Sequence, residues 1–120
     1  MPTSSIKQVG DRGENIAVDY LLNQNFEIIE TNYRYGHGEI DIVAKERDVL
    51  VFVEVKTRKN LEFGYPVQAI TKNKQRQVRK IAEAYLYEKK IIDTDCRIDV
   101  IAILFRKDLP PKITHIKNAF

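Results

Sequence analysis

Apolar residues recur along the chain with the three- and four-residue spacing of a helix face in two segments. The spacing predicts one helix over residues 10–23, with an apolar stripe made of Ala17, Val18, Leu21 and Leu22. It predicts a second helix over residues 71–90, with a stripe made of Val78, Ile81, Ala82, Tyr85 and Leu86. Both helices are therefore expected to pack one face against other elements.

Between and after these helices the pattern is that of strands. Strands are predicted over residues 26–33, 39–44, 49–55 and 97–104, and an edge strand over 112–117 after a turn at Pro110 and Pro111. Residues 49–55 are almost all apolar and β-branched, which is typical of a central strand covered on both faces. Residues 57–70 are expected to form a loop, and residues 1–8 to be flexible.

The resulting order is α-β-β-β-α-β with a possible final strand. Three consecutive strands can form an antiparallel meander, and a right-handed β-α-β crossover then places the fourth strand parallel to the third. The fold class is therefore α/β, with helices packed on a mixed sheet. A chain of 120 residues fits one domain of about 100–200 residues. We predict a single domain over residues 1–120.

Composition and charge narrow the possible locations and partners. A single cysteine, Cys96, rules out an internal disulfide. No apolar run approaches the ~18 residues that span a bilayer, and the first residues do not resemble a signal peptide, so we expect a cytoplasmic protein without a membrane partner. The net charge of +3 permits nucleic-acid binding without requiring it. A local basic segment, residues 72–80, is the stronger indication.

The strongest chemical signal lies at the end of the most apolar strand. Because side chains alternate along a strand, Glu54 and Lys56 continue the row of Leu50 and Phe52. A buried carboxylate needs compensation, either from a base such as Lys56 or from a metal ion. Taken alone, Glu54 and Lys56 could simply form a structural ion pair.

A second acid on the preceding strand changes that balance. Strand alternation places Asp41 on one face with Glu39 and Val43, and Ile40, Ile42 and Ala44 on the other. In a hairpin closed around residues 46–48, Asp41 lies beside Glu54. Two adjacent carboxylates repel each other without a cation and together favour a hard divalent ion such as Mg²⁺ or Mn²⁺.

The first helix offers a third acid. At 100° per residue, Glu14 lies within about 60° of Ala17, Val18 and Leu21, so it is expected to point toward the sheet. Taken alone, Glu14 is an ordinary acid near a helix start. Glu14 is a candidate site residue only because it is expected to lie near Asp41 and Glu54.

An Asp followed by Glu-x-Lys on the next strand, with a preceding helical Glu, resembles the PD-(D/E)XK nucleases. The sequence further resembles the YraN family of bacterial proteins, through GENIA at 13–17, GEIDIV at 38–43, VFVEVKTR at 51–58 and CRIDVI at 96–101. This resemblance implies a restriction-endonuclease-like fold, similar to that of archaeal Holliday-junction resolvases. Ile40 stands where the superfamily name has proline.

The hypothesis that follows is metal-dependent hydrolysis of a phosphodiester. Asp41 and Glu54 would hold the ion, with the carbonyl of Val55 as a further ligand, while Lys56 would position the attacking water. Glu14 would hold the metal's water shell or a second ion. Branched or junction DNA is one substrate that the resemblance suggests, and a homodimer would then supply two equivalent sites.

Basic residues near this site are candidates for phosphate contacts, namely Arg34, Arg58, Lys59, Lys72, Lys74 and Arg76. DNA is favoured over RNA as the partner. Two alternatives remain open: a nucleic-acid-binding or interaction module that keeps the fold without catalysis, and a structural protein whose acids merely pair with bases.

Four other residues are expected to be structural. His37 and His115 are interpreted as surface residues, and Cys96 as a small buried hydrophobe. Arg97 and Asp99 share a strand face and are interpreted first as a structural pair, and second as contributors to the site.

Overall fold

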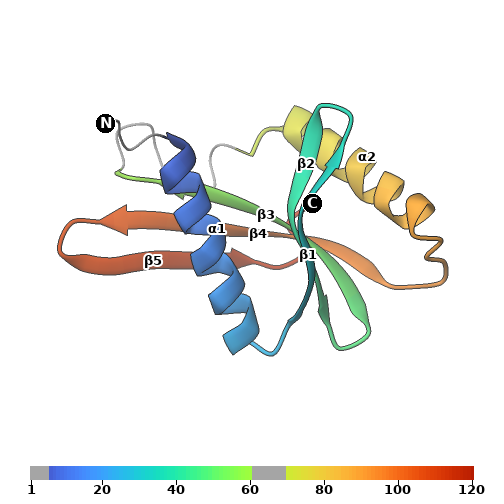
Figure 1. The fold of residues 1–120 in the computed structure, drawn as a ribbon, viewed down its shortest axis with the longest axis horizontal. Helices are drawn as coiled ribbons and strands as arrows, with labels where there is room; N and C mark the ends of the chain where they lie inside the picture. Colours follow the sequence, from blue (N-terminus) through green and yellow to red (C-terminus); the bar gives the residue numbers. More distant parts are fainter. Residues whose placement is uncertain (1–5, 61–69) are drawn as a thin grey trace.

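A computed structural model of the protein describes residues 6–60 and 70–120. It contains two helices and five strands in the order α-β-β-β-α-β-β (Figure 1). The helices are α1 (Ile6–Asn23) and α2 (Lys72–Glu88). The strands are β1 (Glu27–Tyr35), β2 (Gly38–Glu46), β3 (Val49–Arg58), β4 (Cys96–Arg106) and β5 (Leu109–Ile116).

The five strands form one mixed sheet in the order β1-β2-β3-β4-β5. The β1–β2, β2–β3 and β4–β5 pairs are antiparallel, whereas β3 and β4 are parallel and joined through α2. The predicted meander and crossover are therefore confirmed. This order of elements and mixed sheet are those of a restriction-endonuclease-like fold.

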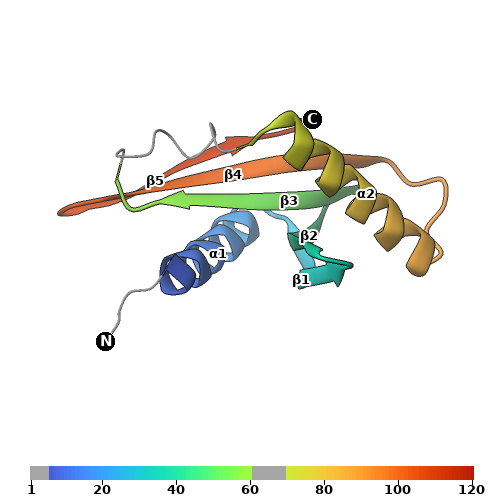
Figure 2. The ribbon, with the colours of Figure 1, turned by 90° about the horizontal axis from the view of Figure 1, so that it is seen from above.

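The helices bury two separate apolar clusters. The cluster under α2 contains Val78, Ile81 and Tyr85 with Phe52 of β3. The cluster under α1 contains Ala17 and Leu21 with sheet residues that include Val51 and Val53. Consecutive residues of β3 thus serve opposite clusters, as expected for a central strand covered on both faces. Figure 2 shows α1 and α2 at different parts of the sheet, with β3 between them.

The sheet forks between β2 and β3, and this fork positions the candidate site. The β2–β3 ladder runs only as far as the pair Ile42–Val53. Beyond it, residues 38–41 pair with β1 alone, whereas residues 54–58 pair with β4 alone. The two halves of the sheet therefore diverge just where Asp41 and Glu54 would have been paired.

The fork also corrects the expected alternation of β2. Ile40 and Ile42 were predicted to share a face, but Ile40 belongs to the cluster under α2 and Ile42 to the cluster under α1. In a regular strand, residues two apart lie on the same face. The strand therefore turns its faces over at Asp41, where it leaves β3.

Several expected boundaries were wrong. Pro110 and Pro111 lie within β5 rather than in a turn, which an edge strand tolerates because one of its sides has no ladder partner. Leu22, expected in the buried stripe of α1, is 52% exposed. Helix α1 begins at Ile6, so residues 6–8 are not a loose end, while residues 1–5 lie outside the described residues. In the expected 57–70 loop, residues 57–58 continue β3 and residues 61–69 are not described.

Neither α1 nor α2 combines the length and the apolar character that crossing a membrane requires.

Gly13 allows the close approach of α1 to β3 that brings Glu14 to the fork. A Cβ at Gly13 would lie 2.2 Å from Cγ2 of Thr57, which is the methyl of a β-branched side chain. A Cβ at Gly10, one helical turn earlier, would meet no atom of residues 6–60 and 70–120 within 4 Å. The two glycines therefore form a matched pair, with the same helix propensity and different surroundings.

We expect Gly13→Ala to destabilise the protein by about 1 kcal/mol or more, despite the gain of about 1 kcal/mol in helix propensity. Gly10→Ala should stabilise it by about 0.5–1 kcal/mol. Urea unfolding of the two variants beside wild type gives the free energies of unfolding. Equal stabilisation by both substitutions would show that α1 does not depend on contact between Gly13 and Thr57.

Candidate functional site

The carboxylate of Asp41 closes the end of the β2–β3 ladder. Its Oδ2 accepts a hydrogen bond from the backbone N–H of Val55, with 2.7 Å between the two atoms. A side chain thus takes the place of the backbone carbonyl that a continuing ladder would have supplied. This bond fixes Asp41 beside Glu54, the residue that precedes Val55.

Glu54 is buried, with 4% of its surface exposed, yet it is only half satisfied. Its Oε1 lies 3.9 Å from Nζ of Lys56 and 3.9 Å from Nζ of Lys74. Its Oε2 has no hydrogen-bond partner among the described residues. A buried carboxylate oxygen without a partner is costly, which makes it a ready ligand for a cation.

Asp41 is unusual in its protonation. Burial, and after it the negative charge of Glu54, raise the pKa of Asp41 from 3.8 to about 8; the hydrogen bond from Val55 opposes the rise. Two adjacent carboxylates in a buried place cannot both ionise without cost. A side-chain hydrogen bond between Asp41 and Glu54 adds to the rise, so in the absence of a cation the two carboxylates favour sharing one proton.

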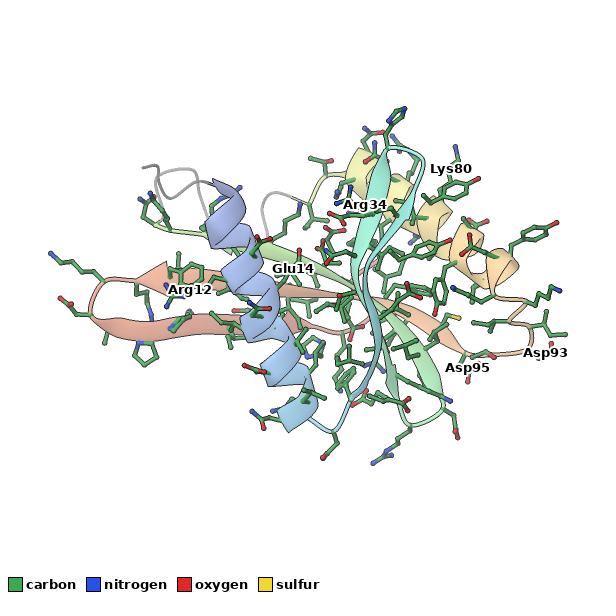
Figure 3. All side chains as sticks on the ribbon, viewed as in Figure 1. Arg12, Glu14, Arg34, Lys80, Asp93 and Asp95 are labelled. Carbon is green, nitrogen blue, oxygen red and sulfur yellow. The ribbon has the colours of Figure 1, made fainter. Side chains whose placement is uncertain are left out.

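Glu14 reaches the same region from α1. Figure 3 shows it on the side of α1 that faces the β1–β2 hairpin. Its Oε1 accepts a hydrogen bond of 2.9 Å from Nδ2 of Asn32, and the same nitrogen lies 3.4 Å from Oε2 of Glu39. Burial raises the pKa of Glu14; the Asn32 bond opposes that rise, while the charges of Asp41 and Glu39 add to it. Glu14, Glu39, Asp41 and Glu54 thus surround one fork.

The donor set fits a hard divalent cation in part. No three His, Cys, Asp or Glu side chains within residues 6–60 and 70–120 are arranged to hold a metal ion. Asp41 and Glu54 alone provide carboxylate oxygens from neighbouring strands, one of them unpartnered. Mg²⁺ suits such a set, since it often binds one or two carboxylates and keeps several waters. A backbone oxygen such as the Val55 carbonyl would add to these ligands.

The basic residues predicted to contact phosphates divide into three places. Arg34 lies on the hairpin that packs against α2, is largely exposed and pairs with Glu39 at 3.9 Å (Figure 3). Arg58 ends β3 and exposed Lys59 follows it, and Nη1 of Arg58 donates to the carbonyl of Thr57. Lys72 and Arg76 are exposed on α2, whereas Lys74 faces Glu54.

Sequence reasoning missed the contacts of Asn32 and Lys74 with the acidic residues. The signal for Lys74 was present, because it extends the buried stripe Val78, Ile81 and Tyr85 backward by four residues. Asn32 had no comparable signal: it adopts a φ of 54° within β1, which asparagine tolerates better than most residues. Its neighbours Thr31 and Tyr33 pair with Ile42 and Ile40, so Asn32 lies across from Asp41.

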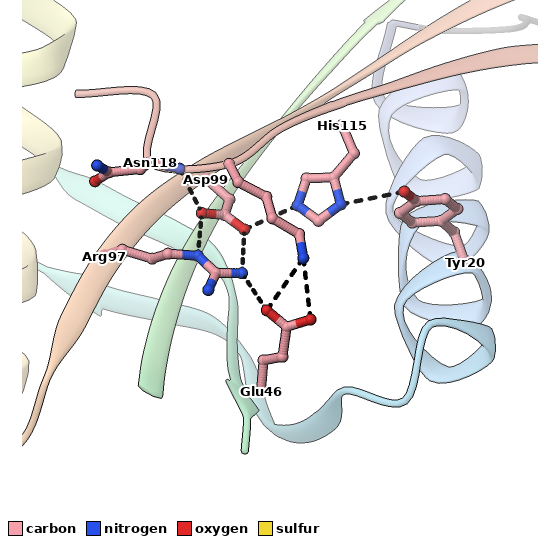
Figure 4. Close-up of polar contacts among 7 residues, drawn as sticks. Tyr20, Glu46, Arg97, Asp99, His115 and Asn118 are labelled. Atoms are coloured by element: carbon pink, nitrogen blue, oxygen red, sulfur yellow. Dashed lines mark hydrogen bonds and ion pairs between the residues drawn. The ribbon is translucent and has the colours of Figure 1, made fainter. Parts of the chain in front are cut away.

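A second polar cluster, centred on Asp99, is fully satisfied (Figure 4). Its carboxylate accepts hydrogen bonds from Nε and Nη2 of Arg97 at 2.9 and 3.2 Å, and from the N–H of Asn118 at 3.0 Å. Nε2 of His115 lies 2.8 Å from Oδ2, and Tyr20 Oη lies 3.1 Å from the other ring nitrogen.

These bonds confirm the predicted Arg97–Asp99 pair and place it away from the fork. Arg97 also binds Glu46 at 2.6 Å, and Glu46 lies about 16 Å along β2 from Asp41. Burial alone would raise the pKa of Asp99, but the bonds from His115, Arg97 and Asn118 lower it. The expectation that His115 is a surface residue was wrong, since its side chain is 6% exposed. Cys96, expected to be buried, is exposed at the start of β4.

Comparison with known proteins connects this fold to one family. The model of the uncharacterised protein family UPF0102 matches residues 13–103. A UPF0102 protein of Geotalea daltonii is 52% identical over 114 residues, covering 95% of this chain and 90% of its own. A UPF0102 protein of Clostridioides difficile is 43% identical over 114 residues, covering 95% and 97%. One of Dictyoglomus turgidum is 43% identical over 119 residues, covering 95% and 98%.

The raised pKa of Asp41 predicts an unusual dependence of stability on pH. The folded state binds this proton more tightly than the unfolded chain does. Protonated Asp41 therefore contributes to the free energy of unfolding fully below pH 4, and this contribution is lost as pH rises toward 8. With a chelator present, Asp41→Asn should therefore be more stable than wild type at pH 8, on the order of 1 kcal/mol or more. The difference should shrink at pH 5. Urea unfolding at both pH values measures it, and a difference independent of pH would contradict the assignment.

The pH dependence of stability that Asp99 produces is the reverse of that of Asp41. Because its pKa is lowered in the folded state, ionised Asp99 stabilises the fold above pH 4, and this stabilisation is lost in acid. Asp99→Asn should destabilise the protein by about 3 kcal/mol at pH 7, since it leaves Arg97 without its buried partner. The exposed Asp95 provides the matched control, and Asp95→Asn should change the free energy of unfolding by less than about 0.5 kcal/mol. If both variants unfold at the same urea concentration, the Asp99 cluster does not support the fold.

Proposed function

This chain belongs to the uncharacterised protein family UPF0102, and we propose that it is a metal-dependent endonuclease that hydrolyses phosphodiester bonds in DNA. The family match confirms the resemblance of the sequence to the YraN family. The family has no established activity, so the proposal rests on the chemistry of the fork.

One observation carries the proposal: Asp41 and Glu54 are adjacent buried carboxylates, the pKa of Asp41 is raised to about 8, and Oε2 of Glu54 has no hydrogen-bond donor among the described residues when Asp41 is ionised. A structural role alone would favour the opposite arrangement, with each buried oxygen satisfied. Pockets that keep strongly perturbed acids together are characteristic of functional sites. The acids also stand where the β2–β3 ladder ends.

The residues divide the work by position. Asp41 and Glu54 would hold Mg²⁺ or Mn²⁺, with the Val55 carbonyl as a further oxygen, and Glu14 and Asn32 would orient water at the α1 side of the fork. The ion would supply Lewis-acid activation of the phosphate and a more acidic water. Lys56, two residues from Glu54 on β3, would orient the attacking water and stabilise charge that develops on the phosphate.

The surrounding cations support a nucleic-acid substrate. Arg34, Arg58, Lys59, Lys72 and Arg76 provide positive groups on the hairpin, the end of β3 and α2. Such groups bind the phosphate backbone without reading sequence. A homodimer would supply two equivalent sites for a substrate with two symmetric strands, such as a DNA junction, and a cytoplasmic location would bring the protein to bacterial DNA.

A nucleic-acid-binding module without catalysis is the second candidate. It is favoured by the finding that no three ligating side chains in the described part of the chain form a metal site. The two candidates agree on the basic surface and differ in whether a divalent cation binds at Asp41 and Glu54. Metal response and cleavage therefore distinguish them.

Asp41→Asn and Glu54→Gln should abolish cleavage and remove the rise in melting temperature that Mg²⁺ or Mn²⁺ produces in wild type, because each loses a charged ligand. Lys56→Ala should keep the metal-dependent rise and lower turnover by about a hundredfold. Glu83→Gln, an exposed acid on α2, is the control and should behave as wild type. The assay uses a panel of branched, flapped, nicked and linear DNAs.

The outcome that opposes the proposal is equally specific. If wild type cleaves none of these DNAs and its melting temperature does not respond to either ion, the endonuclease is excluded. Retained binding of DNA in that case would support the binding module.

A further inference from the structure

The residue that the proposed function leaves without a role at the fork is Lys74. It lies on the buried face of α2, in register with Val78, and its ammonium is 3.9 Å from Oε1 of Glu54. The side-chain oxygen of Thr71 accepts a hydrogen bond of 3.1 Å from the N–H of Lys74, which fixes the first turn of the helix. Most basic residues of α2 are exposed and could contact phosphates, whereas Lys74 lies beside Glu54.

We propose that Lys74 is a coupling residue: it neutralises Glu54 while no divalent cation is bound, and moves to a phosphate of the nucleic acid when a cation takes its place. The inference rests on the proposed function, because it requires a cation at Asp41 and Glu54. It adds that binding of the cation and binding of DNA strengthen each other through one side chain.

Geometry favours the release of Lys74 over that of Lys56. Both ammonium groups lie 3.9 Å from the same Oε1, longer than a direct hydrogen bond, so neither is locked to it. Lys56 is two residues from Glu54 on the same strand, and its side chain is 24% exposed. Lys74 comes from a different element, and its side chain is 33% exposed. A lysine stem has four rotatable carbons, so its head can move without any change in the helix.

Charge supplies the driving force. Lys56 and Lys74 together balance one carboxylate oxygen of Glu54, and a divalent ion on the same carboxylate would repel both ammonium groups. The neighbouring exposed side chains on α2, Lys72 and Arg76, mark where a phosphate backbone would run. Lys74 then adds one phosphate contact that the cation-free protein does not offer.

Reciprocity makes the coupling measurable without any cleavage. If a cation frees Lys74 for DNA, DNA must raise the affinity for the cation by the same factor. Each phosphate contact contributes about one unit to the slope of log affinity against log salt concentration. Ca²⁺, which binds oxygen ligands, serves as the probe for binding to a short DNA duplex, followed by fluorescence anisotropy.

For wild type we expect Ca²⁺ to tighten DNA binding by about tenfold and to steepen the salt slope by about one unit. Lys74→Gln should show the same slope with Ca²⁺ as with a chelator. Lys72→Gln, the matched control on the same turn, should keep the steepening, whatever its absolute affinity. Without DNA, Lys74→Gln should bind Ca²⁺ about tenfold more tightly than wild type, because a competing cation is gone.

The outcomes separate the inference from the function. A Lys74→Gln variant that keeps the Ca²⁺-dependent steepening, or that binds Ca²⁺ no more tightly than Lys72→Gln does, overturns the coupling and leaves the nuclease proposal intact. Wild-type protein that binds DNA but does not bind Ca²⁺, Mg²⁺ or Mn²⁺ overturns both. Far-ultraviolet circular dichroism of both variants confirms that α2 is retained.

Discussion

The hydrogen bond from the Val55 N–H to the Asp41 carboxylate is the constraint on which the candidate site depends. It ends the β2–β3 ladder with a side chain, so that β2 continues with β1 and β3 continues with β4. Side chains from opposite faces of a continuous sheet cannot meet. At a fork they can, and here Glu14 arrives from α1 while Lys74 arrives from α2.

The two buried acidic centres, Asp99 and the pair Asp41 and Glu54, differ in how fully their oxygens are hydrogen-bonded. Asp99 is fully buried and receives hydrogen bonds from three residues, and its pKa is lowered. Glu54 is nearly as buried, yet one of its oxygens has no hydrogen-bond partner in the part of the chain that the structure describes, and its neighbour Asp41 has a raised pKa. Both centres belong to the same sheet. The difference is that Arg97, His115 and Asn118 satisfy Asp99, whereas Glu54 has only two lysines at 3.9 Å.

Much of the fold followed from the sequence because both helices have clear apolar stripes and β3 is almost wholly apolar. The pairing of Asp41 with Glu54 was also accessible, since a tight hairpin fixes which strand positions adjoin. Other features depend on contacts between elements and could not be predicted from the sequence. Ile40 changes face because β2 leaves β3. Asn32 reaches Glu14 from a position of β1 with positive φ, and His115 is buried between Asp99 and Tyr20.

Lys74 illustrates a different limit. Its place on the buried stripe of α2 could be predicted from the helical spacing, but the run of bases at residues 72–80 was interpreted as a nucleic-acid-binding segment. Periodicity should have taken precedence over composition, because a helix divides any basic run between its two faces. The sequence showed which residues were basic, and the helix phase decided which of them would meet an acid.

The balance of charge at the fork also implies an order of binding. The four carboxylates of Glu14, Glu39, Asp41 and Glu54 are accompanied by three bases, with Lys56 and Lys74 beside Glu54 and Arg34 beside Glu39. With the proton that the raised pKa of Asp41 favours, these charges nearly cancel, so the fork by itself offers a phosphate little net attraction. The overall charge of +3 adds little here, because charges farther than about 10 Å are largely screened at moderate salt. Under the proposed function a divalent ion would make the fork positive, so we expect the cation to bind before, or together with, the phosphate.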